Sequence, residues 1–121
     1  MYDIGLRNGD IWKSRLIGED SVQRGTGLVL AIANDVSCIT SPNCTILTLS
    51  KKKPIYKTHV LIPSNHETGL IVDSTSMAET ITTISKKMLI HKIGFINEDI
   101  MKEVQHSLLI HLNILRLINS L

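Results

Sequence analysis

The sequence predicts a mainly β fold with a C-terminal helix, an α+β arrangement in which a small, strongly curved β-sheet or barrel packs against that helix. The apolar residues are nearly all Ile, Leu and Val, and β-branched side chains favour strands. Short apolar runs separated by Gly, Pro and Asn fill most of the chain, and only the last segment has helical periodicity. The length of 121 residues suits one domain, residues 1–121.

The first third of the chain predicts two strands. Residues 10–16 alternate imperfectly after an Asn-Gly turn signal, which indicates a strand. Residues 19–27 are polar and contain glycine, which indicates a loop or an irregular hairpin. Residues 28–33 are an unbroken apolar run, the pattern of a strand buried on both faces. Residues 36–43 end in a Ser-Pro-Asn turn.

The middle of the chain predicts further short strands. Residues 44–49 and 58–62 are apolar and β-branched, and a Lys-Lys-Lys-Pro loop separates them. Residues 69–73 and 80–84 are further strand candidates, and residues 89–95 are expected to be the last strand. Between these, Ser85 is placed to cap one short helical turn over residues 85–88.

The last segment predicts one amphipathic helix. Asn97 is a suitable N-cap, and Glu98 and Asp99 put negative charge in the first turn, where it complements the helix dipole. Apolar residues then recur at helical spacing, and from Leu108 onward they surround the helix. So apolar a helix must be covered, either by lying across the sheet or by meeting a partner subunit, and the two are compatible.

Composition excludes several classes of protein. No apolar run approaches the roughly 20 residues of a membrane span, and the N-terminus lacks a signal-peptide pattern. Cys38 and Cys44 form no C-x-x-C pattern, so we expect reduced, semi-buried thiols in a cytoplasmic protein, and no metal or cofactor.

Positive charge is concentrated in one loop. Residues 1–60 carry 8 Lys/Arg against 5 Asp/Glu, whereas residues 61–121 carry 5 against 6. Lys51, Lys52 and Lys53 are consecutive, and such a cluster holds phosphates without reading sequence, although a solvated loop has the same pattern. Tyr56 is the one aromatic in this loop that is suited to stacking on an unpaired base, and Trp12 is expected in the core.

The five histidines show no diagnostic spacing. His59 lies in a predicted strand and is expected either to be structural or to line a groove. His66, His91, His106 and His111 are expected to be structural or exposed. His106 and His111 are five residues apart, which does not place them squarely on one helix face.

Several motifs, taken in order, resemble the MazF/PemK/Kid toxin family. Residues 8–12 (Asn-Gly-Asp-Ile-Trp) are similar to its opening R-G-D-I-W strand, and residues 23–30 to its Q-R-G-T-R-P-V-L segment. Residues 34–35 match its N-D pair, and residues 58–60 its T-H-V strand. The resemblance runs from about residue 7 to 116, and the order and spacing of the motifs make it specific.

The resemblance implies an SH3-like barrel (CcdB/Kid/MazF-like) with a C-terminal helix, assembled as a two-fold homodimer. It implies an mRNA interferase, a metal-independent endoribonuclease that cuts single-stranded RNA to a cyclic phosphate and a 5′-hydroxyl, and an antitoxin protein that neutralises it. Relatives of the same fold inhibit DNA gyrase instead, so fold alone does not fix activity.

The resemblance also suggests site residues, with two departures. The family's arginines fall at Gly27 and Thr82, where neither side chain carries a charge, and its catalytic threonine falls at Ser50, which keeps a hydroxyl. Arg24 is the nearest guanidinium and is the candidate replacement, or else a surface side chain. Ser50 is a candidate catalytic hydroxyl, or else a strand-end serine bonded to nearby backbone.

The remaining RNA-binding candidates are Gln23, Thr26, Lys51, Lys52, Lys53, Tyr56 and His59. Two alternatives to an active ribonuclease remain open. Loss of both family arginines favours a catalytically impaired binding protein for RNA, an antitoxin peptide or another protein. A CcdB-like gyrase inhibitor is the third option, and the motifs match the RNA-cutting branch better.

Overall fold

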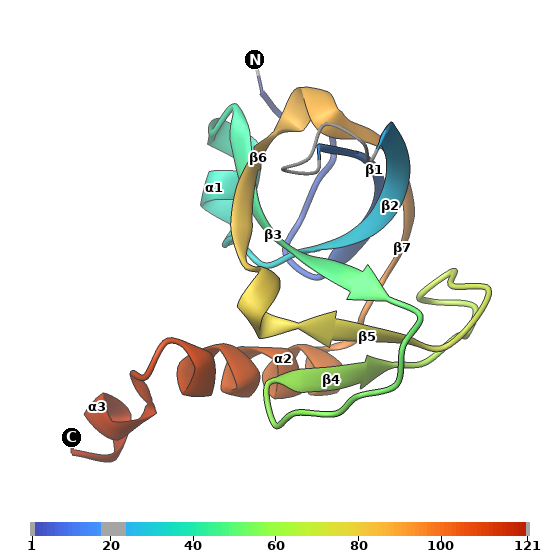
Figure 1. The fold of residues 1–121 in the computed structure, drawn as a ribbon. Coiled ribbons are helices and arrows are strands. Elements are labelled where there is room, and N and C mark those ends of the chain that lie inside the picture. Colours follow the sequence, from blue (N-terminus) through green and yellow to red (C-terminus); the bar gives the residue numbers. More distant parts are fainter. Residues whose placement is uncertain (1, 18–23, 121) are drawn as a thin grey trace.

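A computed structural model describes residues 2–17 and 24–120, in which a strongly curved sheet carries the helices (Figure 1). The predicted mainly β class and the C-terminal helix are confirmed. In chain order the elements are β1 (Asp10–Ile17), β2 (Arg24–Ala31), α1 (Asp35–Thr40), β3 (Asn43–Ser50), β4 (His59–Ile62), β5 (Ser74–Met77), the 3₁₀ turn η1 (Ala78–Thr80), β6 (Thr82–Ser85), the 3₁₀ turn η2 (Lys86–Met88), β7 (Leu89–Phe95), α2 (Glu98–His111) and α3 (Leu115–Asn119).

The sheet is antiparallel, and its path runs β4-β5-β3-β2-β1-β7, with β6 paired to β3. β3 changes partners along its length: Asn43 to Ile46 pair with β6, Ile46 to Thr48 pair with β2, and Leu49 and Ser50 pair with β5. β2 and β3 therefore separate near Ser50. Strands β1, β2, β3, β6 and β7 form a ring in Figure 1, and α2 lies below that ring, beside β4.

Each face of the sheet has its own core, because successive side chains of a strand point to opposite faces. The core inside the ring contains Leu6, Trp12, Val29, Ala31, Cys38, Cys44 and Ile46. The outer core, shared with β4 and α2, includes Ile11, Leu30, Leu47, Val60, Ile62, Met101 and Val104. The prediction that the run from residue 28 is buried on both faces is confirmed by Val29 and Leu30, which belong to different cores, although the strand ends at Ala31.

In the first three quarters of the chain, the strand predicted at residues 69–73 was wrong, and one helix was not predicted. Residues 35–40 form a helix, which Asn34 caps by accepting a hydrogen bond from the Ser37 amide at 2.9 Å. Residues 69–73 form no strand, because Gly69 has a φ of +67° and its backbone packs against that of Ile93. The strand predicted at 80–84 is shifted to Thr82–Ser85, and the short turn after Ser85 is confirmed, with the Ser85 hydroxyl accepting from the Lys87 amide.

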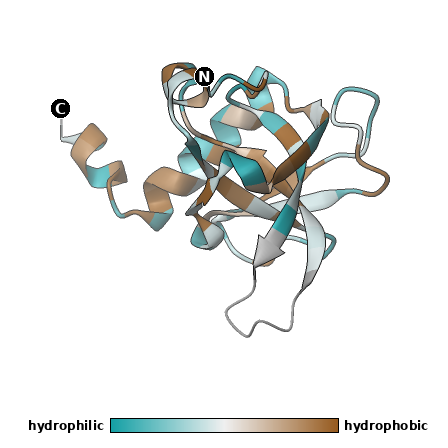
Figure 2. Ribbon diagram, turned by 90° about the horizontal axis from the view of Figure 1, so that it is seen from above, coloured by the Kyte–Doolittle hydropathy of each residue, from teal (hydrophilic) through white to brown (hydrophobic). Residues whose placement is uncertain are grey.

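The C-terminal helix begins as predicted and ends earlier. Asn97 accepts a hydrogen bond from the Ile100 amide at 2.9 Å and caps α2. A single helix through residue 118 was wrong, because the chain turns at Asn113, which has a φ of +58°, and α3 follows. In Figures 1 and 2, α3 extends away from the rest of the molecule and carries apolar residues, of which Leu117 and Ile118 are exposed. No helix in the described part of the chain has the length and apolar character to cross a membrane.

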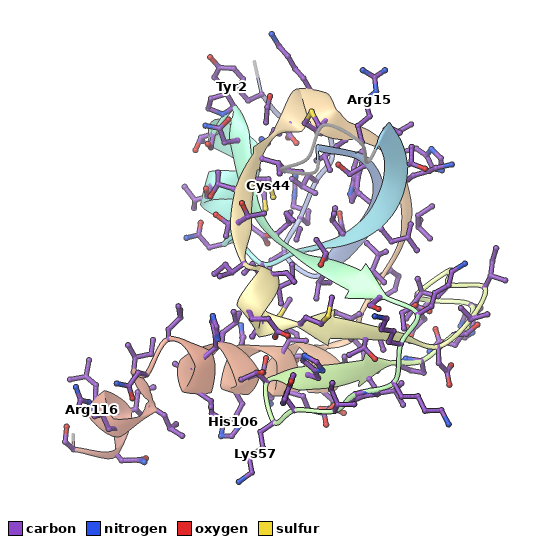
Figure 3. The ribbon with its side chains drawn as sticks, in the orientation of Figure 1. Tyr2, Arg15, Cys44, Lys57, His106 and Arg116 are labelled. Carbon is purple, nitrogen blue, oxygen red and sulfur yellow. The ribbon has the colours of Figure 1, made fainter. Side chains whose placement is uncertain are left out.

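The two cysteines are free and fully buried rather than semi-buried, at 0% and 1% exposure for Cys38 and Cys44. Figure 3 shows Cys44 inside the ring of strands. Burial raises the pKa of both thiols, and it raises that of Cys44 to about 12.

A pH dependence of stability follows from Cys44. Above about pH 9 the unfolded chain releases this proton and the folded chain keeps it, so the thiol's contribution to stability is complete below pH 9 and is lost as the pH rises towards 12. Urea unfolding at about pH 7, 9 and 10 measures the effect, because these values lie on both sides of the ordinary pKa of a free thiol. Cys44→Ala is the control, and it should show a smaller decline over this range. Equal declines in both proteins would contradict the assignment.

Candidate active site

The candidate catalytic positions lie where β2 and β3 separate. Val29 and Thr48 form the last pair before these strands separate, and Gly27 and Ser50 each lie two residues beyond that pair on their own strand. Residues two apart in a strand share a face, so Gly27 and Ser50 lie on the side of Val29, which faces into the ring. The two positions that the sequence motifs suggested thus share one face of the sheet, at the end of the β2–β3 pairing.

Ser50 is half-buried, and its hydroxyl oxygen accepts a hydrogen bond from the Lys52 amide at 3.1 Å. The buried Thr75 hydroxyl donates to the Lys52 carbonyl and fixes the other side of this turn. The Ser50 oxygen is thus hydrogen-bonded to nearby backbone at the end of the strand, as one of the two interpretations of the sequence expected. Its hydroxyl hydrogen takes no part in that bond, so it can point toward a ligand.

The second arginine position of the family is on the same face. Thr82 pairs with Ile46, and Ile46 belongs to the core inside the ring. Thr82 is exposed and uncharged. Arg15, the nearest arginine on β1, pairs with Thr26 and points away from the ring in Figure 3. Arg24 begins β2, and Gln23 lies outside the described residues.

A pocket of about 460 Å³ lies on the other face of β2. We call it the lateral pocket. The residues that line it include Lys13, Thr26, Leu28, Leu49, Lys51 and His91. The structure thus brings the predicted residues Thr26 and Lys51 together, with the Gly27 backbone between the pocket and the ring face. Lys13 and His91 were missed as site residues, because only the register of β1 with β7 makes them neighbours.

Lys52 and Lys53 lie apart from the lateral pocket. They line an adjoining open hollow with Lys51, Leu61 and Val72. Lys51 lines both, so the basic loop lies between the two depressions. This loop is exposed along its whole length, which suits contact with a polyanion.

His59 and Tyr56 are not brought to Gly27 and Ser50. The His59 Nδ1 accepts from the Ile55 amide at 3.3 Å, so its Nε2 carries the hydrogen and donates to Glu79 at 2.6 Å. The Tyr56 ring meets the His59 ring edge-on, 4.9 Å between centroids. Desolvation raises the pKa of Glu79, but the hydrogen bond from His59 and a backbone hydrogen bond more than offset it and hold that pKa below its usual value. The contacts of His59 are those of a structural residue.

Comparison with known proteins identifies a family and relatives for this chain. The family model described as "PemK-like, MazF-like toxin of type II toxin-antitoxin system" matches residues 7–112. Endoribonuclease EndoA of Bacillus subtilis (strain 168) is 31% identical, over 88% of this chain and 94% of the relative.

Solved structures share the fold at low sequence identity. An endoribonuclease from a mycobacterial species has a TM-score of 0.78 at 14% identity, over 95% of this chain and 98% of its own. A mycobacterial endoribonuclease in complex with its cognate antitoxin has a TM-score of 0.75 at 16% identity, over 90% and 96% of the two chains. MazF in a MazE–MazF structure from Deinococcus radiodurans has a TM-score of 0.72 at 13% identity, over 91% and 97%. These likenesses confirm the predicted fold class.

Proposed function

This chain belongs to the family of PemK-like, MazF-like toxins of type II toxin–antitoxin systems, and from that membership we propose that it is an mRNA interferase, an endoribonuclease that cuts single-stranded RNA without a metal. The observation that carries the proposal is the placement of Ser50 at the end of the β2–β3 pairing, on the same face as Gly27 and beside an exposed run of lysines. The relation to a protein named as an endoribonuclease supports the activity.

The proposed reaction is attack of a ribose 2′-oxygen on the adjacent phosphorus. The 2′-hydroxyl loses its proton to water as the P–O2′ bond forms, the P–O5′ bond breaks, and the leaving 5′-oxygen takes a proton from water. The products are a 2′,3′-cyclic phosphate and a 5′-hydroxyl. The Ser50 hydroxyl donates a hydrogen bond to a phosphate oxygen as charge builds on it. Arg24 begins β2 three residues before Gly27, so strand alternation puts this position on the face of Thr26 rather than that of Ser50. Its proposed role as the source of positive charge at the reacting phosphate therefore requires the start of β2 to turn toward Ser50.

The other site assignments concern binding. Lys51, Lys52 and Lys53 hold the phosphates of the strand, and Gln23, Thr26 and Tyr56 are the proposed contacts beside them. His59 stabilises the base of this loop through Ile55 and Glu79, so we assign its part in RNA binding to the positioning of Tyr56.

We further propose that residues 1–121 act as one domain in the cytoplasm, as a homodimer that an antitoxin protein neutralises. The exposed apolar residues of the C-terminal segment, Leu112, Ile114, Leu117 and Ile118, suit a subunit or partner contact. A structural relative is described in complex with its cognate antitoxin, which supports the partner class.

The test is incubation of the purified protein with a long mixed-sequence RNA in EDTA. We expect fragments that end in a cyclic phosphate and begin with a 5′-hydroxyl, and growth arrest when the protein is expressed. Intact RNA after hours, with a known toxin cutting alongside, would refute the activity.

Ser50→Ala should slow cleavage by roughly ten- to a hundred-fold, the value of a hydrogen bond to a charged group, about 1.5–3 kcal/mol. Ser50→Thr is the matched control, because it restores a hydroxyl at the same position, and it should cleave like the unmodified protein. The initial rate on one RNA substrate measures both. Equal rates for the alanine and threonine variants would remove Ser50 from the mechanism.

One observation favours a second function, that of a binding protein without activity. Gly27 and Thr82 leave the ring face without either family arginine. Affinity for RNA that falls with salt, with no cleavage over hours, would identify this function.

A further inference from the structure

We propose that the lateral pocket binds one unpaired nucleotide of the RNA strand, with Lys13, Lys51 and His91 on its phosphates and aliphatic side chains against its base. The proposal rests on the proposed function for the identity of the strand. It assigns a role to Lys13 and His91, which lie on the opposite face of the sheet from Gly27 and Ser50.

The strand register places the cationic residues in one row. Lys13 on β1 pairs with Leu28 on β2 and with His91 on β7. Directly paired residues share a face with Cβ atoms about 4.5–5.5 Å apart. All three residues line the lateral pocket, so the row forms one of its walls. The next residue, Lys92, instead forms an ion pair with Asp10 at 3.2 Å.

The charge of the pocket favours an anion. Lys13 and Lys51 each carry an ammonium group, and the His91 ring offers nitrogen donors. No carboxylate lines the pocket within the described part of the chain. Asp73 comes directly after Val72, but it lines the adjoining hollow. There its carboxylate accepts a hydrogen bond from the Ser64 amide at 2.8 Å.

The walls suit the flat apolar surface of a base. Leu28, Leu49 and Ile93 line the interior, and Ile71 and Val72 stand at the mouth with 95% and 45% of their surface exposed. A volume of about 460 Å³ is within the usual range of small-molecule sites, about 300–1,000 Å³. A pocket with aliphatic walls and cations at its edge fits a nucleotide better than it fits a bare phosphate.

The pocket adjoins the candidate active site, which favours RNA over other anions. Gly27 has no side chain, and its backbone lines the pocket from the strand that faces Ser50. Leu49 and Lys51, on either side of Ser50, both line the pocket. In this proposal, an RNA strand whose phosphate lies at Ser50 passes the end of the β2–β3 pairing and places a neighbouring nucleotide in the pocket.

The test is the affinity of the full chain for a mixed-sequence 2′-O-methyl oligoribonucleotide, which the protein cannot cut because the attacking oxygen is blocked. Lys13→Glu is expected to weaken binding at least about tenfold and to reduce the salt dependence by at least one phosphate contact. Lys102→Glu on α2 is the matched control, with the same change of charge at an exposed lysine outside the pocket, and should bind like the unmodified protein.

A second variant tests the walls. Ile71→Ser changes a side chain that is 95% exposed, so it preserves the fold, and it is expected to weaken binding of the oligonucleotide but not of an abasic version of the same backbone. Equal binding by Lys13→Glu and Lys102→Glu would overturn the proposal. So would an effect of Lys13→Glu on an acidic peptide of alternating Glu and Leu but not on the oligonucleotide, because the pocket would then hold a peptide.

Cleavage of long RNA by the unmodified protein, measured in parallel, separates the two proposals. Cleavage together with unchanged oligonucleotide binding in Lys13→Glu rejects the pocket and keeps the activity. Weaker binding in Lys13→Glu without any cleavage keeps the pocket and rejects the activity. Absence of oligonucleotide binding by the unmodified protein overturns the pocket.

Discussion

Gly27→Arg is expected to raise the rate of RNA cleavage by roughly a hundred- to a thousand-fold, the effect of one electrostatic stabiliser, about 2.7–4 kcal/mol. Residue 27 and Ser50 each lie two residues beyond the Val29–Thr48 pair, on the face that looks into the ring, so we expect a guanidinium there to share the phosphate with the Ser50 hydroxyl. Single-turnover cleavage of a defined RNA measures the chemical step without product release.

Thr26→Arg is the matched control for this gain. It adds the same charge one residue away, but strand alternation places residue 26 on the face of the lateral pocket, away from Ser50. It should leave the single-turnover rate at saturating protein unchanged while tightening RNA binding. Equal gains from both variants would mean that charge near β2, rather than an arginine at the reacting phosphate, limits the reaction.

Gly94→Ala is expected to destabilise the fold by about 3 kcal/mol, the upper part of the range for overpacking. A Cβ on Gly94 would overlap the carbonyl oxygens of Glu67 and Thr68. These are backbone atoms, and the Glu67 carbonyl accepts a hydrogen bond from the Phe95 amide at 2.9 Å, so neither can move without breaking the contact between β7 and residues 67–70. Urea unfolding at neutral pH measures the loss.

Gly25→Ala provides the comparison, because a Cβ there meets no atom of the described residues within 4 Å. Its effect should stay within about 0.5 kcal/mol of zero, as for a surface substitution without a special contact. Gly94→Ala should also disturb the lateral pocket, since Gly69 and Leu70, in the segment displaced, line it. Similar stabilities for the two variants would show that residues 67–70 adjust freely.

Much of the candidate site was predictable from motif order. The family pattern identified Ser50, Gly27 and Thr82, and the structure brings these positions to one face. The family pattern did not predict that Thr26 and Lys51 would face away from these three positions, or that His59 would be hydrogen-bonded to Ile55 and Glu79. The face that Thr26 and Lys51 occupy depends on the strand pairing, and the role of His59 depends on the partners of both its ring nitrogens. Neither can be read from spacing along the chain.

Local chemistry by itself determined the strands at residues 10–16 and 89–95, the turn after Ser85 and the start of the C-terminal helix, because alternation, β-branching and side-chain caps act within a few residues. The tertiary structure alone decided the rest. Residues 69–73 look like a strand, but the backbone of Ile93 packs against Gly69, and Lys13 meets His91 only through β1 and β7. The free energy that decides these features comes from contacts between segments far apart in sequence, and the lateral pocket is one of their products.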